Sequence, residues 1–437
     1  MQKPCRRVLI ITYYWPPSGG SGVQRWLKMA KYLPQFGWEP IIYTPQNPEL
    51  MTRDEELLKE VSPDLKVWKR PIFEPYFWYK IFTGKRKRAI NPGFISDHVQ
   101  NVSIKERIAL FIRSNFFFPD PRCFWRRPSV RYLSKRLKTE PVDWIITTGP
   151  PQSMHLIGRD LRRKTNIPWL ADFRDPWTGI YYFKHLRMTP LQVKRHKKAE
   201  QSVVREADIV TVVSPQMKRD FTSLQHTQIE VIPNGFDEDD FKVEPKNYDE
   251  KFAIIHTGLF TKDANPNQLW KALSSLANTT SDFRERLLIV LVGQTDGAVK
   301  ESIEEVGLSS YTRFVGYVSH LEAVSYQKGA DLLLLSLKKE PESKGIITGK
   351  LFEYLAAGKP VLGIGPVEGD LARILSQCNA GVMYEFEDFE GIKQYVKKHF
   401  NAFLRNSSIH APLQEEIATY SRNNLCEKMA ALLGKNR

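Results

Sequence analysis

The chain has 437 residues, of which 42% are hydrophobic and 26% are charged. Globular domains usually contain about 100–200 residues, so this length and composition predict two globular domains and exclude a disordered or low-complexity chain. The charge is uneven: residues 1–235 carry 40 Lys and Arg against 21 Asp and Glu, whereas residues 236–437 carry 24 against 28. A basic half suits an anionic partner, such as a phosphate-bearing substrate, a membrane surface or nucleic acid.

Targeting and redox features favour a cytoplasmic protein. No stretch approaches the roughly 20 consecutive apolar residues of a membrane span, and no small-residue cleavage site follows the apolar run near the N-terminus. The four cysteines, Cys5, Cys123, Cys378 and Cys426, form no CxxC pair and have no histidine nearby at metal-ligand spacing. We therefore expect neither a disulfide framework nor a zinc site. The chain is not expected to cross a membrane, but a peripheral position on the inner face of the cell membrane is compatible with it.

In chain order, short apolar runs alternate with helical patterns, the first of which covers residues 23–33. Strands are predicted at residues 8–14, 39–44, 144–148, 169–173 and 209–213. Pro233-Asn234-Gly235 marks a turn. Beyond it, strands are predicted at 252–256, 287–292, 313–317, 332–335 and 361–364, and helices at 266–276, 321–329, 350–357 and 369–375. Such alternation indicates βαβ units, so we predict an α/β chain with two Rossmann-like, doubly wound domains, residues 1–235 and 236–437.

Two segments do not follow the alternation. At residues 71–128, aromatic side chains interleave with Lys and Arg. This pattern fits an insertion with its own small core, a membrane-facing or acceptor-binding surface, or base stacking on a basic groove. The last amphipathic segment, 413–433, closes the structure, and one interpretation packs it on the N-terminal domain. Basic runs at 85–88, 126–138, 159–164 and 194–198 together predict an electropositive face, although each alone also fits a solvated surface.

Three polar groups in the first half follow predicted strands. The loop at 16–22 (PPSGGSG) precedes a helix, whose free N–H groups can hold a phosphate; the alternative is a tight turn without a ligand. His155 lies one turn past a strand end, where ligands of open α/β sheets bind, although a lone histidine is more often structural. Asp172, Arg174 and Asp175 directly follow another strand. They either pair with one another or bind a polar substrate, and both can hold.

In the second half, Thr348 is placed to cap a helix whose first N–H groups can hold a diphosphate. Lys350 adds a cation, and Glu353, one turn further on, offers a carboxylate that suits a ribose diol. The alternative is an ordinary capped helix with surface charges. The acidic run 237–240 is interpreted as a linker, because no second ligand cluster suggests a metal site.

These segments, in this order, resemble the retaining family-4 glycosyltransferases with the GT-B fold, in which two Rossmann-like domains face a cleft. The resemblance covers essentially the whole chain. It rests on the Pro-Pro-Ser-Gly-Gly loop, IITTGPPQSMHLIG, IPWLADFRDPWTG, VIPNGFD, HTGLF and TGKLFEYLAAGKPVLGIG. The ordered set is similar to a bacterial branch that builds cell-surface polysaccharide or lipopolysaccharide.

The resemblance implies a UDP- or GDP-linked sugar donor, bound mostly on the C-terminal domain without a metal. By that resemblance, Glu353 would grip the ribose of the donor. The backbone of Thr348, Gly349 and Leu351 would hold the donor phosphates, with Lys350 beside them.

Further residues of the donor site follow from the same resemblance. Gly19 and Gly20 would face the diphosphate from the other domain, and His155 would lie near the donor sugar. Lys262 would stand in for the phosphate-binding lysine that follows the first strand of the second domain. Among these residues His155, Lys262 and Lys350 are the predicted catalytic ones.

The sequence also departs from the family pattern. The family usually has two glutamates separated by seven residues, but Gly345 occupies the first of these positions, and Glu342 is out of register. This departure bears on the contact with the donor sugar. An arginine often found near the start of the second domain is replaced by Phe260, which weakens the phosphate clamp assigned to Lys262.

The predicted function is therefore that of a retaining hexosyltransferase-type glycosyltransferase. It would move a sugar from a nucleotide sugar to a hydroxyl of a glycan or lipid-linked acceptor, with no nucleic-acid partner. Three alternatives remain at this point: a sugar-nucleotide epimerase on the same fold, a basic nucleic-acid-binding protein, and a non-catalytic scaffold.

Overall fold

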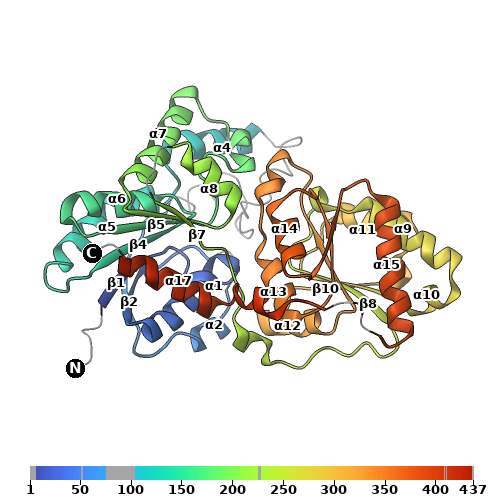
Figure 1. The fold of residues 1–437 in the computed structure, drawn as a ribbon. Coiled ribbons are helices and arrows are strands. Elements are labelled where there is room, and N and C mark those ends of the chain that lie inside the picture. The colour runs from blue at the N-terminus through green and yellow to red at the C-terminus, as the bar shows by residue number, and fades with distance from the viewer. Residues whose placement is uncertain are drawn as a thin grey trace. The chain divides into compact units, whose positions relative to one another are not determined.

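The computed structural model describes residues 6–50, 53–74, 104–224, 228–407, 409 and 411–435. The chain divides into two compact units, each built on one sheet flanked by helices (Figure 1). Unit 1 comprises Met1–Ile232 together with Cys426–Arg437, and unit 2 comprises Pro233–Leu425. The prediction of two Rossmann-like α/β domains is confirmed. The division falls between Ile232 and Pro233, just ahead of the predicted turn.

The described strands of unit 1 form one parallel sheet in the order β3-β2-β1-β4-β5-β6-β7. They are β1 (Arg6–Ile11), β2 (Trp38–Pro45), β3 (Lys66–Arg70), β4 (Trp144–Gly149), β5 (Trp169–Phe173), β6 (Ile209–Val212) and β7 (Ile229–Val231). The helices are α1 (Ser21–Tyr32), α2 (Glu56–Lys59), α4 (Ile104–Phe116), α5 (Cys123–Arg136), α6 (Ser153–Thr165), α7 (Pro190–Glu206) and α8 (Pro215–Thr222). The last helix, α17 (Arg422–Lys435), reaches α1, where the Cys426 thiol donates to the carbonyl oxygen of Met29.

The described strands of unit 2 form a second parallel sheet in the order β10-β9-β8-β11-β12-β13. They are β8 (Phe252–Thr257), β9 (Leu287–Val292), β10 (Thr312–Gly316), β11 (Leu332–Ser336), β12 (Val361–Ile364) and β13 (Gly381–Tyr384). The helices are α9 (Asn267–Thr279), α10 (Ser281–Arg286), α11 (Gly297–Glu305), α12 (His320–Lys328), α13 (Gly349–Ala357), α14 (Asp370–Gln377), α15 (Phe389–Leu404) and α16 (Gln414–Ala418).

Strands β5 and β9 are buried along their whole length because helices cover both faces of each sheet. All six residues of β9 (LLIVLV) and all five of β5 (WLADF) are buried. Continuous apolar runs of this kind are typical of parallel sheets, whereas one-sided sheets show alternation. These strands lie within a residue of their predicted bounds for that reason.

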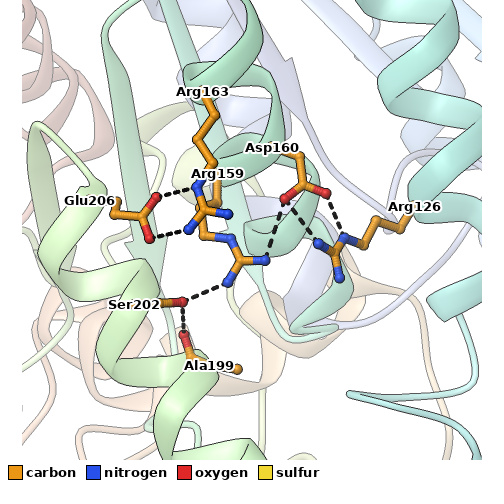
Figure 2. A network of polar contacts seen from close by, with 7 residues as sticks. All are labelled: Arg126, Arg159, Asp160, Arg163, Ala199, Ser202 and Glu206. Carbon is orange, nitrogen blue, oxygen red and sulfur yellow. Dashed lines mark hydrogen bonds and ion pairs between the residues drawn. The ribbon is translucent and has the colours of Figure 1, made fainter.

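The helices α5, α6 and α7 are joined by arginine–carboxylate pairs, which Figure 2 shows. Arg126 of α5 donates two hydrogen bonds, of 2.7 and 2.9 Å, to Asp160 of α6. Arg163 of α6 donates two, both of 2.6 Å, to Glu206 of α7. Much of the basic run 159–164 is therefore paired within unit 1. It contributes less to an electropositive face than the sequence suggests.

The aromatic and basic segment at 71–128 is only partly described, because residues 75–103, including the run at 85–88, lie outside the described residues. The described part contains α4 and α5. Trp125 of α5 stacks on Tyr43 of β2 with ring centroids 4.8 Å apart, so α5 belongs to the core of unit 1. Among the described residues, no helix combines the length and the hydrophobicity that a membrane crossing requires.

Candidate functional site

The switch point of the sheet in unit 2 lies between β8 and β11. From β8 the chain runs outwards to β9 and β10, and it then returns to β11 on the other side of β8. Ligands of open parallel sheets bind beyond the carboxyl ends of the strands at such a point. β8 ends in His256 and Thr257, and α13, which follows β11, begins at Gly349 and Lys350. The candidate site is built from these two elements.

His256 is a buried polar residue in an otherwise apolar strand. Its Nδ1 lies 3.0 Å from the carbonyl oxygen of Leu334 in β11. A carbonyl oxygen only accepts, so Nδ1 carries the proton and Nε2 presents a lone pair. The ring stacks on Phe260 with centroids 4.1 Å apart. Burial, together with the charge of Lys350, holds the pKa of His256 well below its usual value, so the ring is neutral.

Lys350 lies in the first turn of α13 and reaches back to β8. Its Nζ lies 3.1 Å from Nε2 of His256 and 3.4 Å from the carbonyl oxygen of Leu259. Burial lowers the pKa of Lys350 to about 8, against the opposing effect of Glu353. Among the described residues, no carboxylate lies within 4 Å of this ammonium. At neutral pH it is therefore a cation with two neutral hydrogen-bond partners.

Glu353 is held on one side and open on the other. Its Oε2 accepts a hydrogen bond of 2.8 Å from Nε2 of Gln327, a buried residue of α12. The same amide nitrogen lies 3.0 Å from Oγ1 of Thr257 at the end of β8. Oε1 lies 3.9 Å from Nδ1 of His320, beyond hydrogen-bonding distance. The carboxylate is thus oriented and keeps an oxygen for a ligand.

Two glycines in the left-handed region shape the loop after β8. Gly258 has a φ of +95°, and a Cβ there would lie 3.4 Å from Cε of Lys350. Gly293, at the end of β9, has a φ of +115°, and a Cβ there would lie 2.4 Å from the carbonyl oxygen of Gly258. Side chains at both positions would be strained by the positive φ, and one at Gly293 would also collide with the backbone of Gly258.

The start of α13 contains the other predicted donor contacts. Thr348 occupies the N-cap position, but its hydroxyl makes no capping bond, and Oγ1 is buried without a partner. Gly349 is half-buried, and a Cβ there would meet open space. The N–H of Leu351 donates to the carbonyl oxygen of Thr348, and its side chain lies in the core. Since the first N–H groups of a helix have no acceptor within it, those of Gly349 and Lys350 are the ones suited to a phosphate.

The remaining predicted residues of unit 2 lie around this centre. Lys262 is exposed in a short 3-10 helix after β8. Phe260, which replaces the arginine of the family pattern, is buried, and its ring packs against His256. Gly345 is half-buried and Glu342 exposed, both in the 3-10 helix before α13. The structure therefore puts no carboxylate at the position that Gly345 occupies.

Asp172 in unit 1 is fully buried and fully hydrogen-bonded. Its Oδ1 accepts from Arg25 and Thr211, both at 2.8 Å. Its Oδ2 accepts from Arg25 at 3.1 Å, from Trp26 at 2.9 Å and from Thr148 at 3.0 Å. Burial raises the pKa of Asp172, but Arg25 and the hydrogen bonds outweigh it, so the pKa is lowered. Asp172 is therefore paired, but with Arg25: among the described residues, no hydrogen bond or ion pair joins it to Arg174 or Asp175.

Arg174 ties together the loops at the switch point of unit 1, which lies between β1 and β4. Its guanidinium donates to the carbonyl oxygens of Gly22 at 2.8 Å, Gly149 at 3.3 Å and Pro150. Gly20, with a φ of +93°, precedes α1 in the same loop and is exposed. The predicted Gly-rich loop and the end of β4 are thus brought together by one arginine.

Asp175 and His155 differ in their exposure to solvent and in their hydrogen-bond partners. Asp175 is half-buried and makes no hydrogen bond or ion pair among the described residues. Burial raises the pKa of Asp175, with Arg174 opposing. His155 has no exposed surface; its Nδ1 lies 3.0 Å from Oγ1 of Thr147, and its Nε2 is buried without a partner. Burial lowers the pKa of His155 to about 3, so the ring is neutral.

Gly19 is half-buried in the loop before α1, next to Gly20. Its predicted contact with the donor diphosphate stays a prediction. In unit 2, Asp240 of the acidic run 237–240 lies 3.2 Å from Nε2 of His320. Within the described ranges, no group of three or more His, Cys, Asp or Glu side chains is arranged to hold a metal ion.

Three residues that orient predicted site residues were not identified from the sequence: His256 and Gln327 in unit 2, and the buried Arg25 in unit 1. Each is a polar side chain on an apolar face, which is the signal that could have identified them. Their partners lie 78, 26 and 147 positions away in the sequence, so the pairings themselves depend on the fold.

Comparison with known proteins agrees with this architecture. Residues 86–240 match the model described as Glycosyltransferase Family 4, and residues 237–424 match the one described as Glycosyl transferases group 1. TuaH of Bacillus subtilis (strain 168), named as a teichuronic acid biosynthesis glycosyltransferase, is 23% identical over 200 residues. That alignment covers 44% of this chain and only 49% of the relative.

Solved structures share the fold along the whole chain. A sucrose-phosphate synthase from Thermosynechococcus elongatus has a TM-score of 0.64 at 15% identity, covering 98% of each chain. A glycosyltransferase from Rickettsia africae has a TM-score of 0.61 at 18% identity, covering 99% of each. WaaG, a glycosyltransferase involved in lipopolysaccharide biosynthesis, has a TM-score of 0.56 at 15% identity, covering 98% of this chain and all of that one. The two family matches, which together span residues 86–424, and the two-sheet fold support a GT-B glycosyltransferase of the family-4 and group-1 type.

Proposed function

We propose that the chain transfers a sugar from a UDP- or GDP-linked donor to a hydroxyl of a glycan or lipid-linked acceptor. The transfer would retain the anomeric configuration and serve cell-surface polysaccharide biosynthesis. The family matches support a glycosyl transfer, and the biosynthetic roles in the names of TuaH and WaaG favour a surface polymer. No metal is needed in this proposal, because the chain supplies its own cation at the start of α13.

One observation carries the proposal: the ammonium of Lys350 lies at the N-terminus of α13 without a carboxylate within 4 Å among the described residues. A half-buried cation is costly without an anion, and the free N–H groups of a helix start add partial positive charge. A diphosphate supplies the missing charge. Glu353, one turn further along the same helix, is spaced to accept hydrogen bonds from the ribose hydroxyls.

The proposed reaction breaks the bond between the anomeric carbon of the donor and the β-phosphate oxygen. The acceptor oxygen forms the new bond to that carbon on the same face, and its proton ends on the departing diphosphate. Negative charge develops on the β-phosphate as the bond breaks. Lys350 and the N–H groups of Gly349 and Lys350 would stabilise that charge most in the transition state.

The other predicted residues stay predictions within this proposal. Asp175 is the best placed of the unit 1 charges to meet an acceptor hydroxyl, because its carboxylate has no hydrogen-bond donor among the described residues. For His155 and Asp172, burial and internal bonds favour a role in holding the β4 and β5 ends in place. Lys262 remains a candidate for a second phosphate contact.

A thermal-shift panel of nucleotide sugars tests the proposal first, since a ligand that binds only the folded state raises the melting temperature. Product analysis by NMR, with and without a glycan acceptor, then identifies the reaction. Transfer that depends on the acceptor supports the proposal. Interconversion of the donor sugar without any acceptor would instead indicate an epimerase. Salt-sensitive nucleic-acid binding with no nucleotide-sugar affinity would also contradict it.

We also propose that unit 1 lies on a membrane surface through the described part of the 71–128 segment. One face of α4 is apolar and exposed at Ile108, Phe111, Ile112 and Phe116. Asn115, on the same face, donates to the carbonyl oxygen of Arg187 and accepts from the N–H of Thr189, both at 2.8 Å. Asn115 thus fixes α4 to the segment before α7, and Leu191 in the first turn of α7 is 75% exposed.

Beside this apolar face, α7 presents Lys194, Lys197 and Lys198. They line a cavity of about 750 Å³ with an apolar floor that includes Met188 and Val193. Among the described residues these lysines form no ion pair, in contrast to the arginines of α6 (Figure 2). Apolar groups that enter the lipid boundary and cations that meet anionic headgroups are the two elements of peripheral binding.

Vesicle sedimentation tests this contact. Each lysine near an anionic surface contributes about 1 kcal/mol, so Lys194, Lys197 and Lys198 changed together to Gln should weaken binding to phosphatidylglycerol vesicles at least about tenfold. The matched control changes Lys393, Lys397 and Lys398 of α15 to Gln, which removes the same charge from unit 2. Equal losses in the two sets, or equal binding to neutral phosphatidylcholine vesicles, would contradict the proposal.

A further inference from the structure

We propose that His256 is the positioning residue for Lys350, whose ammonium it holds at the start of α13 through a neutral imidazole acceptor. The inference rests on the proposed function, because His256 acts on the donor through Lys350 and does not touch it. It goes beyond that function because it explains how one cation is oriented without being neutralised.

The imidazole is itself fixed from three sides. Nδ1 donates to the carbonyl oxygen of Leu334 at 3.0 Å, the ring stacks on Phe260, and only 2% of the residue is exposed. The ring cannot turn without losing the bond to β11, so the lone pair of Nε2 has one direction. Lysine has four rotatable bonds and loses about 2 kcal/mol of side-chain entropy when it is fixed. Because the rigid acceptor lies 3.1 Å from the ammonium, Lys350 has already lost this entropy before the donor binds.

A neutral acceptor suits this position better than a carboxylate. A carboxylate would pair with the ammonium and compete with a diphosphate, whereas an imidazole orients the ammonium and leaves its charge available. The charged or titratable groups that face this pair are few. Glu353 lies one turn along α13 and is turned towards Gln327, at 2.8 Å. The second partner of Lys350 is the carbonyl oxygen of Leu259, which is also neutral.

The neighbouring residue of β8 has a parallel role. Thr257 lies 3.0 Å from the amide nitrogen of Gln327, which also donates to Glu353. The last two residues of β8 therefore orient two charged side chains of α13, Lys350 directly and Glu353 through Gln327. The switch point between β8 and β11 thus positions both the cation and the carboxylate that the proposed donor would meet.

Two substitutions separate positioning from packing. His256→Asn retains an N–H donor at the place of Nδ1 but has no acceptor that reaches Lys350. His256→Gln instead places an amide oxygen at the distance of Nε2.

The full chain is titrated by calorimetry with UDP, GDP, UMP and GMP at pH 7. A hydrogen bond to a charged group contributes about 1.5–3 kcal/mol, so His256→Asn should weaken the nucleoside diphosphate at least about tenfold. The corresponding monophosphate should change less than about twofold, and His256→Gln should regain most of the affinity.

The same titrations in a Lys350→Met background complete the test. If His256 acts through Lys350, His256→Asn has no further effect on diphosphate affinity there, as a double-mutant cycle requires. An equal loss for diphosphate and monophosphate, or an equal loss with and without Lys350, would overturn the positioning role and leave the donor site standing. A wild-type chain that binds neither UDP nor GDP would overturn the proposed function and this inference with it.

Discussion

The ammonium nitrogen of Lys350 lies 3.1 Å from Nε2 of His256, whose other ring nitrogen donates to the carbonyl oxygen of Leu334. Burial holds the pKa of His256 well below its usual value, so the imidazole is neutral and the two side chains form a cation–acceptor pair at the switch point of the unit 2 sheet. The pair leaves a positive charge beside the first N–H groups of α13, which is the feature that favours a diphosphate ligand.

Replacing Lys350 should separate binding from stability. The pKa of this lysine is lowered to about 8, below its value in the unfolded chain, so its charged form disfavours the folded state at pH 7. This unfavourable contribution to folding is fully present below pH 8 and disappears as the pH rises past the pKa of the lysine in the unfolded chain. We therefore expect Lys350→Met to lose nucleoside diphosphate affinity while its melting temperature at pH 7 stays equal or rises. The exposed Lys397→Met is the control, with neither change. A lower melting temperature for Lys350→Met would contradict the assignment.

The affinity for the donor should depend on pH through the same residue. The β-phosphate is ionised above pH 7, since its pKa is about 6. Between pH 7 and 9 the binding of UDP or GDP should therefore weaken as Lys350 loses its proton, by about tenfold for each unit above its pKa. Arginine stays protonated in this range, so Lys350→Arg should remove the dependence. Calorimetric titrations at four pH values measure this pH dependence of the affinity. The same pH dependence in Lys350→Arg would exclude Lys350 as its source.

Asp172 and Asp175 should respond differently to amidation. Asp172→Asn leaves Arg25 buried without its counter-charge, and such losses cost about 3–5 kcal/mol. Asp175→Asn removes a half-buried carboxylate whose pKa is raised by burial and which has no hydrogen bond among the described residues, so this substitution should not lower the free energy of unfolding. Urea denaturation of both variants measures the difference. Comparable destabilisation by the two substitutions would mean that Asp175 has a structural partner.

The sequence predicted most of the fold because several strands are continuous apolar runs, as in β9 and β12. It missed β3 (KVWKR), in which Lys66 and Lys69 are exposed, and the short strands β7 and β13. The predicted segment 413–433 is divided into α16 and α17, because Ser421 pairs with Phe236 in an isolated bridge between them. Local patterns identify buried strands well, but short edge strands depend on their neighbours.

For the site, the sequence indicated the charged residues of α13 and missed what orients them. Lys350 and Glu353 are three positions apart, so a helix start alone brings them to one face. His256 and Gln327 act across β11, α12 and α13, and no spacing along the chain reveals those contacts. Asp172 could not be assigned to pairing or to binding from the sequence, because Arg25, its partner, lies 147 positions away.

Calorimetric titration of the full chain with UDP and GDP, for the wild type and Glu353→Ala, measures whether α13 binds the nucleotide of a sugar donor. We expect the wild type to bind at least one of the two nucleotides and Glu353→Ala to weaken this binding at least about tenfold, the effect of losing a hydrogen bond to a charged group. Glu342→Ala, which removes an exposed carboxylate before α13, should leave the affinity unchanged. Unchanged affinity in Glu353→Ala, or no binding of either nucleotide by the wild type, would contradict the account.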